Sequence, residues 1–131
     1  YLRLSYNYHA ATSLFEIAQC YSRIGEFKKA RKTYQRMIQI LSGYYQNRAK
    51  TELLKLDEGL KKISDYKIQL TEAKNDQDRA EILFDLAVTY HSIACVAKAL
   101  EQCSLIQSLN IDEILKNGAR KLAKEMALRE L

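Results

Sequence analysis

The fold is decided by the stretch SLFEIAQCYSRIGEFKKARKTYQRMIQI, residues 13–40, because the chain repeats it. Residues 82–109 read ILFDLAVTYHSIACVAKALEQCSLIQSL, so Leu-Phe, an acidic residue, an alanine, a tyrosine and a Lys-Ala pair return in the same order. The offset of 69 residues, from Ser13 to Ile82, is close to twice the period of helix–turn–helix repeats, which is about 34 residues. A repeated supersecondary unit without catalytic residues indicates a scaffold that displays a surface.

The first copy predicts two helices joined by a tight turn, because its apolar residues recur at helical spacing. The first predicted buried stripe consists of Leu14, Ile17, Ala18, Tyr21 and Ile24. The second follows Glu26-Phe27 and consists of Ala30, Tyr34, Met37 and Ile38. Gly25 lies between them, where a glycine can take φ > 0 at little cost and reverse the chain.

These residues resemble the tetratricopeptide repeat (TPR) family. The large, small, aromatic, glycine, alanine and aromatic positions of that repeat hold Leu14, Ile17-Ala18, Tyr21, Gly25, Ala30 and Tyr34. The second copy matches at Leu83, Leu86-Ala87, Tyr90 and Ala99. It departs at Ala94, where the turn glycine is expected, and at Cys103, where an aromatic is expected, and neither copy keeps the closing proline. The resemblance implies an all-α fold, a TPR-like α-solenoid of antiparallel helix pairs, and other α-solenoids remain an alternative.

We expect residues 1–131 to form a single helical-repeat domain. The chain does not begin with methionine, which indicates a fragment of something longer, and Tyr1 and Leu4 extend the first stripe backward. The expected segments are a first TPR-like pair at 11–44, a degenerate pair or long helix at 45–79, a second TPR-like pair at 80–113 and a capping or packing helix at 114–131. That last helix would cover the second copy through Ile114, Leu115, Leu122, Met126 and Leu128.

The middle segment allows two structures. Apolar residues from Ala49 to Ala73 keep heptad-like spacing, and one breaker, Gly59, interrupts them. The unbroken stripe, and a cost of only about 1 kcal/mol for an interior glycine, favour one long central helix. The doubled repeat period favours a break into a helix pair. After this segment, Asn75-Asp76-Gln77-Asp78 forms a polar junction in which an aspartate can cap the next helix.

Composition agrees with a helical protein. The chain has no proline and four glycines, and no apolar run is long enough to span a bilayer. The three cysteines, Cys20, Cys95 and Cys103, lie in helical patterns and predict buried thiols in a reducing, cytoplasmic setting. A metal site from Cys95, Cys103 and His91 is the alternative, but no fourth ligand is evident. We expect no cofactor.

Positive charge gathers in the first copy. Residues 1–50 contain nine lysines and arginines against two acids, a net of +7. A basic cluster on the second helix consists of Lys28, Lys29, Arg31, Lys32 and Arg36. We favour a solvated outer face over a nucleic-acid site, because no phosphate loop, RNP-like aromatic pair or zinc finger accompanies it.

Catalysis finds no support. The two histidines, His9 and His91, lie on separate predicted helices, and the sequence has no HExxH or GxSxG motif. The paired acids Asp57-Glu58 and Asp112-Glu113 fit helix ends or charged faces. We therefore expect a protein without enzymatic activity.

The resemblance also implies a partner-binding groove lined by the first helix of each pair. The groove-side positions would be Thr12, Phe15, Gln19, Ser22, Glu81, Phe84, Val88 and His91. The lysine and asparagine that grip a C-terminal carboxylate in some family members are absent here. Phe15 and Phe84 would anchor an apolar segment, or they would pack against neighbouring helices. The resulting hypothesis is a protein or peptide-binding scaffold in a larger intracellular complex; the alternatives are a peptide-sensing regulatory domain and, less favoured, nucleic-acid binding.

Overall fold

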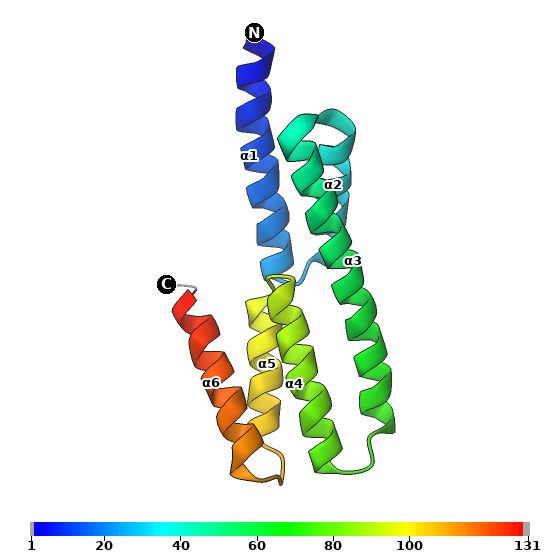
Figure 1. Cartoon of the computed structure of the whole chain (residues 1–131), viewed down its shortest axis with the longest axis vertical. Coiled ribbons are helices and arrows are strands. Elements are labelled where there is room, and N and C mark those ends of the chain that lie inside the picture. Colours follow the sequence, from blue (N-terminus) through cyan, green and yellow to red (C-terminus); the bar gives the residue numbers. More distant parts are fainter. Residues whose placement is uncertain (1, 130–131) are drawn as a thin grey trace. The chain divides into compact units, whose positions relative to one another are not determined.

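The computed structural model describes residues 2–129, and within this range the chain forms six α-helices and no strand (Figure 1). The helices are α1 (Leu2–Arg23), α2 (Phe27–Ile40), α3 (Gly43–Glu72), α4 (Asp76–Ser92), α5 (Val96–Gln107) and α6 (Glu113–Arg129). The predicted all-α class is confirmed. Tyr1, and the side chain of Leu4, lie outside the part of the structure that is described.

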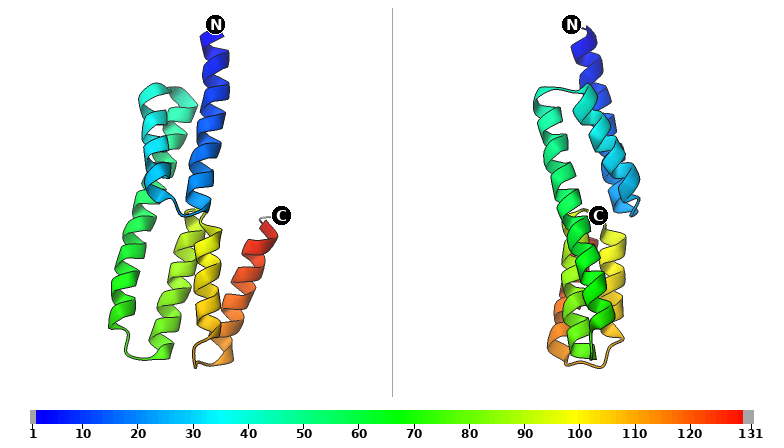
Figure 2. Two further views of the ribbon diagram at one scale, coloured as in Figure 1. Left: turned by 180° about the vertical axis from the view of Figure 1, so that it is seen from behind. Right: turned by 90° about the vertical axis from the view of Figure 1, so that its right-hand side faces the viewer.

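The helices divide between two compact units, one reaching Glu58 and the other starting at Gly59. The first unit contains α1, α2 and the first half of α3. The second contains the other half of α3 together with α4, α5 and α6. Within each unit the repeated helices lie side by side, α1 against α2 and α4 against α5, and α6 packs on α5 (Figure 2).

The turn between α1 and α2 is built on Gly25. Its φ is 85°, in the left-handed region that glycine enters without a Cβ penalty. The Gly25 N–H donates to the Ser22 carbonyl at 3.1 Å, and the Glu26 N–H donates to the Tyr21 carbonyl at 2.8 Å. These bonds satisfy carbonyls at the end of α1, and the prediction of a positive φ at Gly25 is confirmed.

The turn between α4 and α5 repeats this geometry at the same offset of 69 residues. The Ala94 N–H donates to the His91 carbonyl at 3.0 Å, and the Cys95 N–H donates to the Tyr90 carbonyl at 2.9 Å. Ala94 takes a φ of 68°, although an L-residue pays about 1–2 kcal/mol for that conformation. The backbone therefore keeps the turn even where the glycine is missing.

The middle segment is one continuous helix. α3 runs through Gly59 without a break, so these residues do not form a helix pair. Ala49, Leu56 and Ile63 are buried at seven-residue intervals along it. Gly59 is buried too, and a Cβ added there would clash with Cγ2 of Ile93. The glycine therefore marks a close approach of α3 to the end of α4, and it does not mark a turn.

Burial corrects part of the predicted first stripe. Ala18 is fully buried against α2, but Ile17 and Ile24 are exposed. In the second stripe, Tyr34 and Met37 are buried together with Ala30, as predicted. Helical spacing identified which residues share a face of α1, but it could not say whether another helix covers that face.

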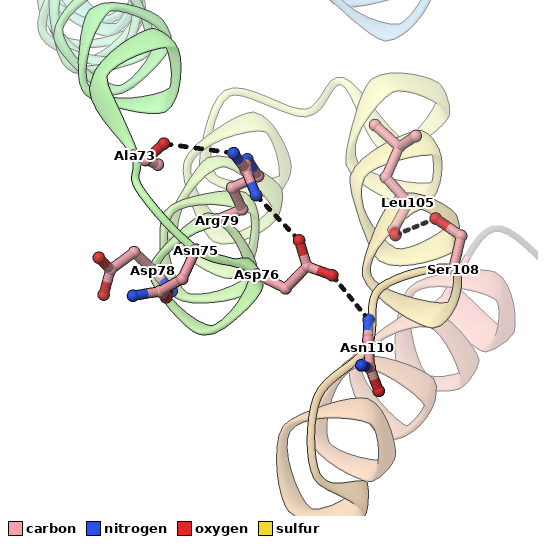
Figure 3. A network of polar contacts seen from close by, with 8 residues as sticks. All are labelled: Ala73, Asn75, Asp76, Asp78, Arg79, Leu105, Ser108 and Asn110. Carbon is pink, nitrogen blue, oxygen red and sulfur yellow. Dashed lines mark hydrogen bonds and ion pairs between the residues drawn. The ribbon is translucent and has the colours of Figure 1, made fainter.

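The start of α4 corrects a second prediction. The capping residue is Asn75, whose side chain accepts from the Asp78 N–H at 2.8 Å. Asp76 has another role: its carboxylate accepts from the Asn110 N–H at 2.9 Å and from Arg79 at 2.9 Å (Figure 3). It thus ties the start of α4 to the loop between α5 and α6.

α6 covers the second copy through fewer residues than predicted. Ala119 and Met126 are buried, whereas Ile114 and Leu128 are exposed. The two buried residues are seven positions apart, like Ala49 and Leu56 in α3. In each unit, a helix with this spacing follows the repeated pair.

Candidate protein-interaction surfaces

Two of the four groove-side residues of the first copy, Phe15 and Ser22, pack within the first unit. The Phe15 ring is half-buried and meets the Tyr34 ring edge-on, with 6.1 Å between centroids. The Arg48 guanidinium of α3 lies 4.5 Å from the centre of the same ring, a distance at which the ring attracts a cation. Ser22 is buried. The contacts with Tyr34 and Arg48 therefore place the Phe15 ring against α2 and α3 within the first unit.

Burial also affects the partner of this ring. It raises the pKa of Tyr34 to about 12, with a smaller contribution from the negative charge of Glu52. The phenol therefore stays protonated at neutral pH and adds no charge beside Phe15. The remaining groove-side residues of α1 are half-buried, as Phe15 is: the Thr12 hydroxyl donates to the Tyr8 carbonyl at 3.0 Å, and Gln19 lies one helical turn beyond Phe15.

The groove-side residues of the second copy are divided. Phe84 is half-buried, and a Cβ added at Gly118 of α6 would lie 3.8 Å from its ring, an ordinary contact distance. Glu81 and Val88 are exposed, and His91 is half-buried. The accessible part of the predicted set on α4 is thus Glu81 and Val88, with His91 at its end.

The basic cluster contains one paired member. Arg31 donates to the Asp57 carboxylate through Nε at 2.6 Å and through a terminal nitrogen at 3.3 Å. The hydrogen bond to Asp57 and its charge raise the pKa of Arg31. This ion pair joins α2 to α3, so Arg31 serves packing within the first unit.

The other four cations of the cluster are exposed. They are Lys28, Lys29, Lys32 and Arg36. The Nζ of Lys29 lies 5.8 Å from the centre of the Tyr21 ring. This contact places positive charge along the edge of α1 where Tyr21 lies.

The cysteines do not all fit the prediction of buried thiols. Cys95 and Cys103 are buried, and burial raises the pKa of each thiol. Cys20 is exposed, which corrects the prediction for that residue. Among the described residues, no three histidine, cysteine, aspartate or glutamate side chains gather in a way that could hold a metal ion. The alternative considered from the sequence, a metal site of Cys95, Cys103 and His91, is therefore not assembled.

The polar junction at the start of α4 has a structural explanation. The Asn110 N–H bond lowers the pKa of Asp76, and Arg79 lowers it further. Arg79 also donates to the Ala73 carbonyl at 3.3 Å, at the end of α3 (Figure 3). The network joins the end of α3, the start of α4 and the loop between α5 and α6. The Asp76 carboxylate and the Arg79 guanidinium are therefore engaged in contacts within the second unit.

Sequence reasoning missed an apolar stripe on α1 that the other helices of the first unit leave exposed. Ile17 is 44% exposed and Ile24 is 67% exposed. Their counterparts in the second copy, Leu86 and Ile93, are 1% and 7% exposed. The residue types are nearly the same in both copies, so no signal in the sequence distinguishes them. The difference lies in the surroundings within each unit: the residues of the second unit bury the stripe on α4, and those of the first unit leave the stripe on α1 exposed.

No family model matches the chain, and comparisons with curated proteins and with solved structures find no match either. The described helices include none with the length and apolar character that a membrane span requires.

Proposed function

We propose that the chain is a non-catalytic protein–protein interaction module, a TPR-like α-solenoid element within a larger assembly, which binds a segment of a partner protein. The observation that carries the proposal is the repeated turn. Gly25 and Ala94 take the same left-handed conformation with equivalent hydrogen bonds. Repetition of one supersecondary unit is typical of repeat scaffolds, whose stacked units create extended binding surfaces.

The free thiols support a reducing, cytoplasmic setting for this module. Cys20, Cys95 and Cys103 form no disulfide, and cysteines are kept reduced in the cytosol. In the proposed assembly the chain contributes helices and supplies no reacting group.

Within this proposal, the partner binds the groove-side residues of α4 that remain accessible. Val88 is 45% exposed and could contribute apolar contact, and Glu81 lies about two turns before it on the same helix. Phe15 contributes by fixing α1 against α2 and α3, since its ring is enclosed by Tyr34 and Arg48.

Cross-linking mass spectrometry on the full-length protein in its native extract tests the proposal. The wild type should cross-link reproducibly to a partner, and Val88→Glu should abolish those cross-links without changing helicity. Leu105→Glu is the matched control, because Leu105 is similarly exposed but lies on α5. Turnover of a small molecule by the purified chain, or unchanged cross-links in the Val88 variant, would contradict the proposal.

A further inference from the structure

The second half of α3 lies against the end of the apolar stripe on α4, at Ile93. Leu86, Tyr90 and Ile93 share one face of α4, since they lie four and three residues apart. All three are buried. The second half of α3 approaches this face so closely at Ile93 that Gly59 has no room for a Cβ. α3 and α4 are joined by only a short turn and run side by side within the second unit (Figures 1 and 2).

The equivalent stripe on α1 has the same chemistry, but the helices of the first unit leave it exposed. Ile17, Tyr21 and Ile24 occupy the positions of Leu86, Tyr90 and Ile93 at the offset of 69 residues. Tyr21 is half-buried, and the two isoleucines are exposed. The same side-chain types at the same spacing should accept the same kind of helix, with a small residue where it crosses the last isoleucine.

The charges beside the stripe differ between the copies. Lys29 borders the stripe on α1, because its Nζ lies over the Tyr21 ring. Lys32 shares this face of α2, and Lys28 lies one helical turn before Lys32. The corresponding positions on α5 are Ala97, Lys98 and Glu101. A helix on α1 would therefore meet a more positive edge than α3 meets on α4, and acidic side chains on that helix would complement it.

We propose that the stripe Ile17–Tyr21–Ile24 binds an amphipathic α-helix of a partner protein, with a glycine or alanine where it crosses Ile24 and acidic residues along the edge facing Lys28, Lys29 and Lys32. The occupant takes the place on α1 that the second half of α3 takes on α4. This inference rests on the proposed interaction function, and it adds a second surface, on α1, together with the class of partner that this surface binds.

A synthetic peptide of residues 55–74 of this chain is the probe, because it contains the segment that covers α4. Fluorescence anisotropy with the full chain should show saturable binding. Ile24→Glu and Ile17→Glu should each weaken that binding by about tenfold or more, the effect of losing a hot-spot contact. Ile24→Ser supplies a milder variant, and circular dichroism should show unchanged helicity in all three. Leu105→Glu is the matched control and should bind as the wild type does.

Two further peptides test the details. A peptide with Gly59→Leu should lose binding, because the leucine would hold the two helices apart. A peptide with Lys61, Lys62 and Lys67 replaced by glutamate should bind more tightly, since these lysines are exposed in α3. That gain should disappear in the Lys28→Glu, Lys32→Glu protein and at high salt.

The outcomes separate this inference from the proposed function. Absence of peptide binding, or binding unaffected by Ile24→Glu, overturns the inference. Sedimentation showing a wild-type dimer that Ile24→Glu converts to a monomer overturns it as well, because the occupant would be a second copy of the chain. A native partner that is lost on Val88→Glu but kept on Ile24→Glu overturns the inference while supporting the interaction function.

Discussion

The two repeated helix pairs have the same turn and different surroundings. Gly25 and Ala94 have φ values of 85° and 68°, and the hydrogen bonds around them correspond. The stripe on α4 is nevertheless buried, whereas the matching stripe on α1 is exposed at Ile17 and Ile24. Turn geometry is thus a local property that both copies keep. Burial depends on which helix lies alongside, and α3 provides that helix for only one copy.

The largest expected effect comes from truncating matched residues of the two stripes. Leu86→Ala should lower the free energy of unfolding by about 2–5 kcal/mol, because it leaves a cavity in a closed core. Ile17→Ala should cost about 1 kcal/mol or less, since that side chain is largely in water already. Urea denaturation of both variants measures the difference. Equal losses would mean that the α1 stripe is covered in solution, and the comparison would fail.

A smaller effect is expected from the glycine where α3 crosses the end of α4. Gly→Ala inside a helix normally stabilises by about 1 kcal/mol, but Gly59→Ala should destabilise by roughly 1–2 kcal/mol, because overpacking against Ile93 outweighs that gain. Gly118→Ala is the matched control and should stabilise by about 0.5–1 kcal/mol, since its Cβ would lie 3.8 Å from Phe84. Chemical denaturation distinguishes the signs. A stabilised Gly59→Ala protein would show that α3 does not approach Ile93 so closely.

Exchanging glycine and alanine in the two turns should change the free energy of unfolding by about 1 kcal/mol. Gly25→Ala should destabilise by about 1–2 kcal/mol, since the alanine must take a left-handed conformation. Ala94→Gly should stabilise by about 0.5–1 kcal/mol, because relief of that cost is partly offset by the greater entropy of glycine in the unfolded chain. Thermal melts of the two single variants measure both shifts. If Ala94→Gly melted below the parent, Ala94 would not be strained in this turn.

The smallest effect concerns the carboxylate that anchors α4. Its pKa is lowered in the folded protein, chiefly by the Asn110 N–H, so Asp76 stabilises the fold above its unfolded pKa near 3.8. That contribution is lost as the pH falls from about 5 through the lower folded pKa. Asp76→Asn should therefore reduce the acid sensitivity of unfolding, measured by denaturation at pH 3 to 7. Asp78→Asn, at the same helix end, controls for the lost charge. Identical pH profiles in the Asp76 variant and the parent would exclude this role.

This anchor has no equivalent at the start of the first copy. The positions corresponding to Asn75 and Asp76 fall inside α1, which begins at Leu2. The capped start of α4 is thus particular to the second copy. It arises because α3 ends at Glu72 and the chain must turn before α4 begins.

Much of the fold could be predicted from the sequence, because its signals are local. The spacing of apolar residues predicted helices on both sides of Gly25, and the structure has α1 and α2 there. The same reasoning left the middle segment open, since Gly59 fits a turn and an interior helical position equally well. Only the position of Ile93 against it explains why a glycine is there.

The candidate site was less accessible to sequence reasoning. Phe15 was considered both as an anchor for a partner and as a packing residue, and its ring lies between Tyr34 and Arg48. Arg31 was grouped with the basic cluster, although its partner Asp57 lies 26 residues away on another helix. Contacts between residues this far apart in the chain leave no mark in the local pattern.

The sequence by itself determined the helices, the repeated pair and the left-handed turn at Gly25, because each depends on residues within a few positions of one another. The tertiary structure decided which apolar stripe is covered, which cation is paired and which thiol is buried. Each of these depends on a helix brought close by folding. Two stripes of nearly identical composition therefore differ in exposure, since α3 lies against the stripe on α4 at Ile93, whereas the helices of the first unit leave Ile17 and Ile24 on α1 exposed.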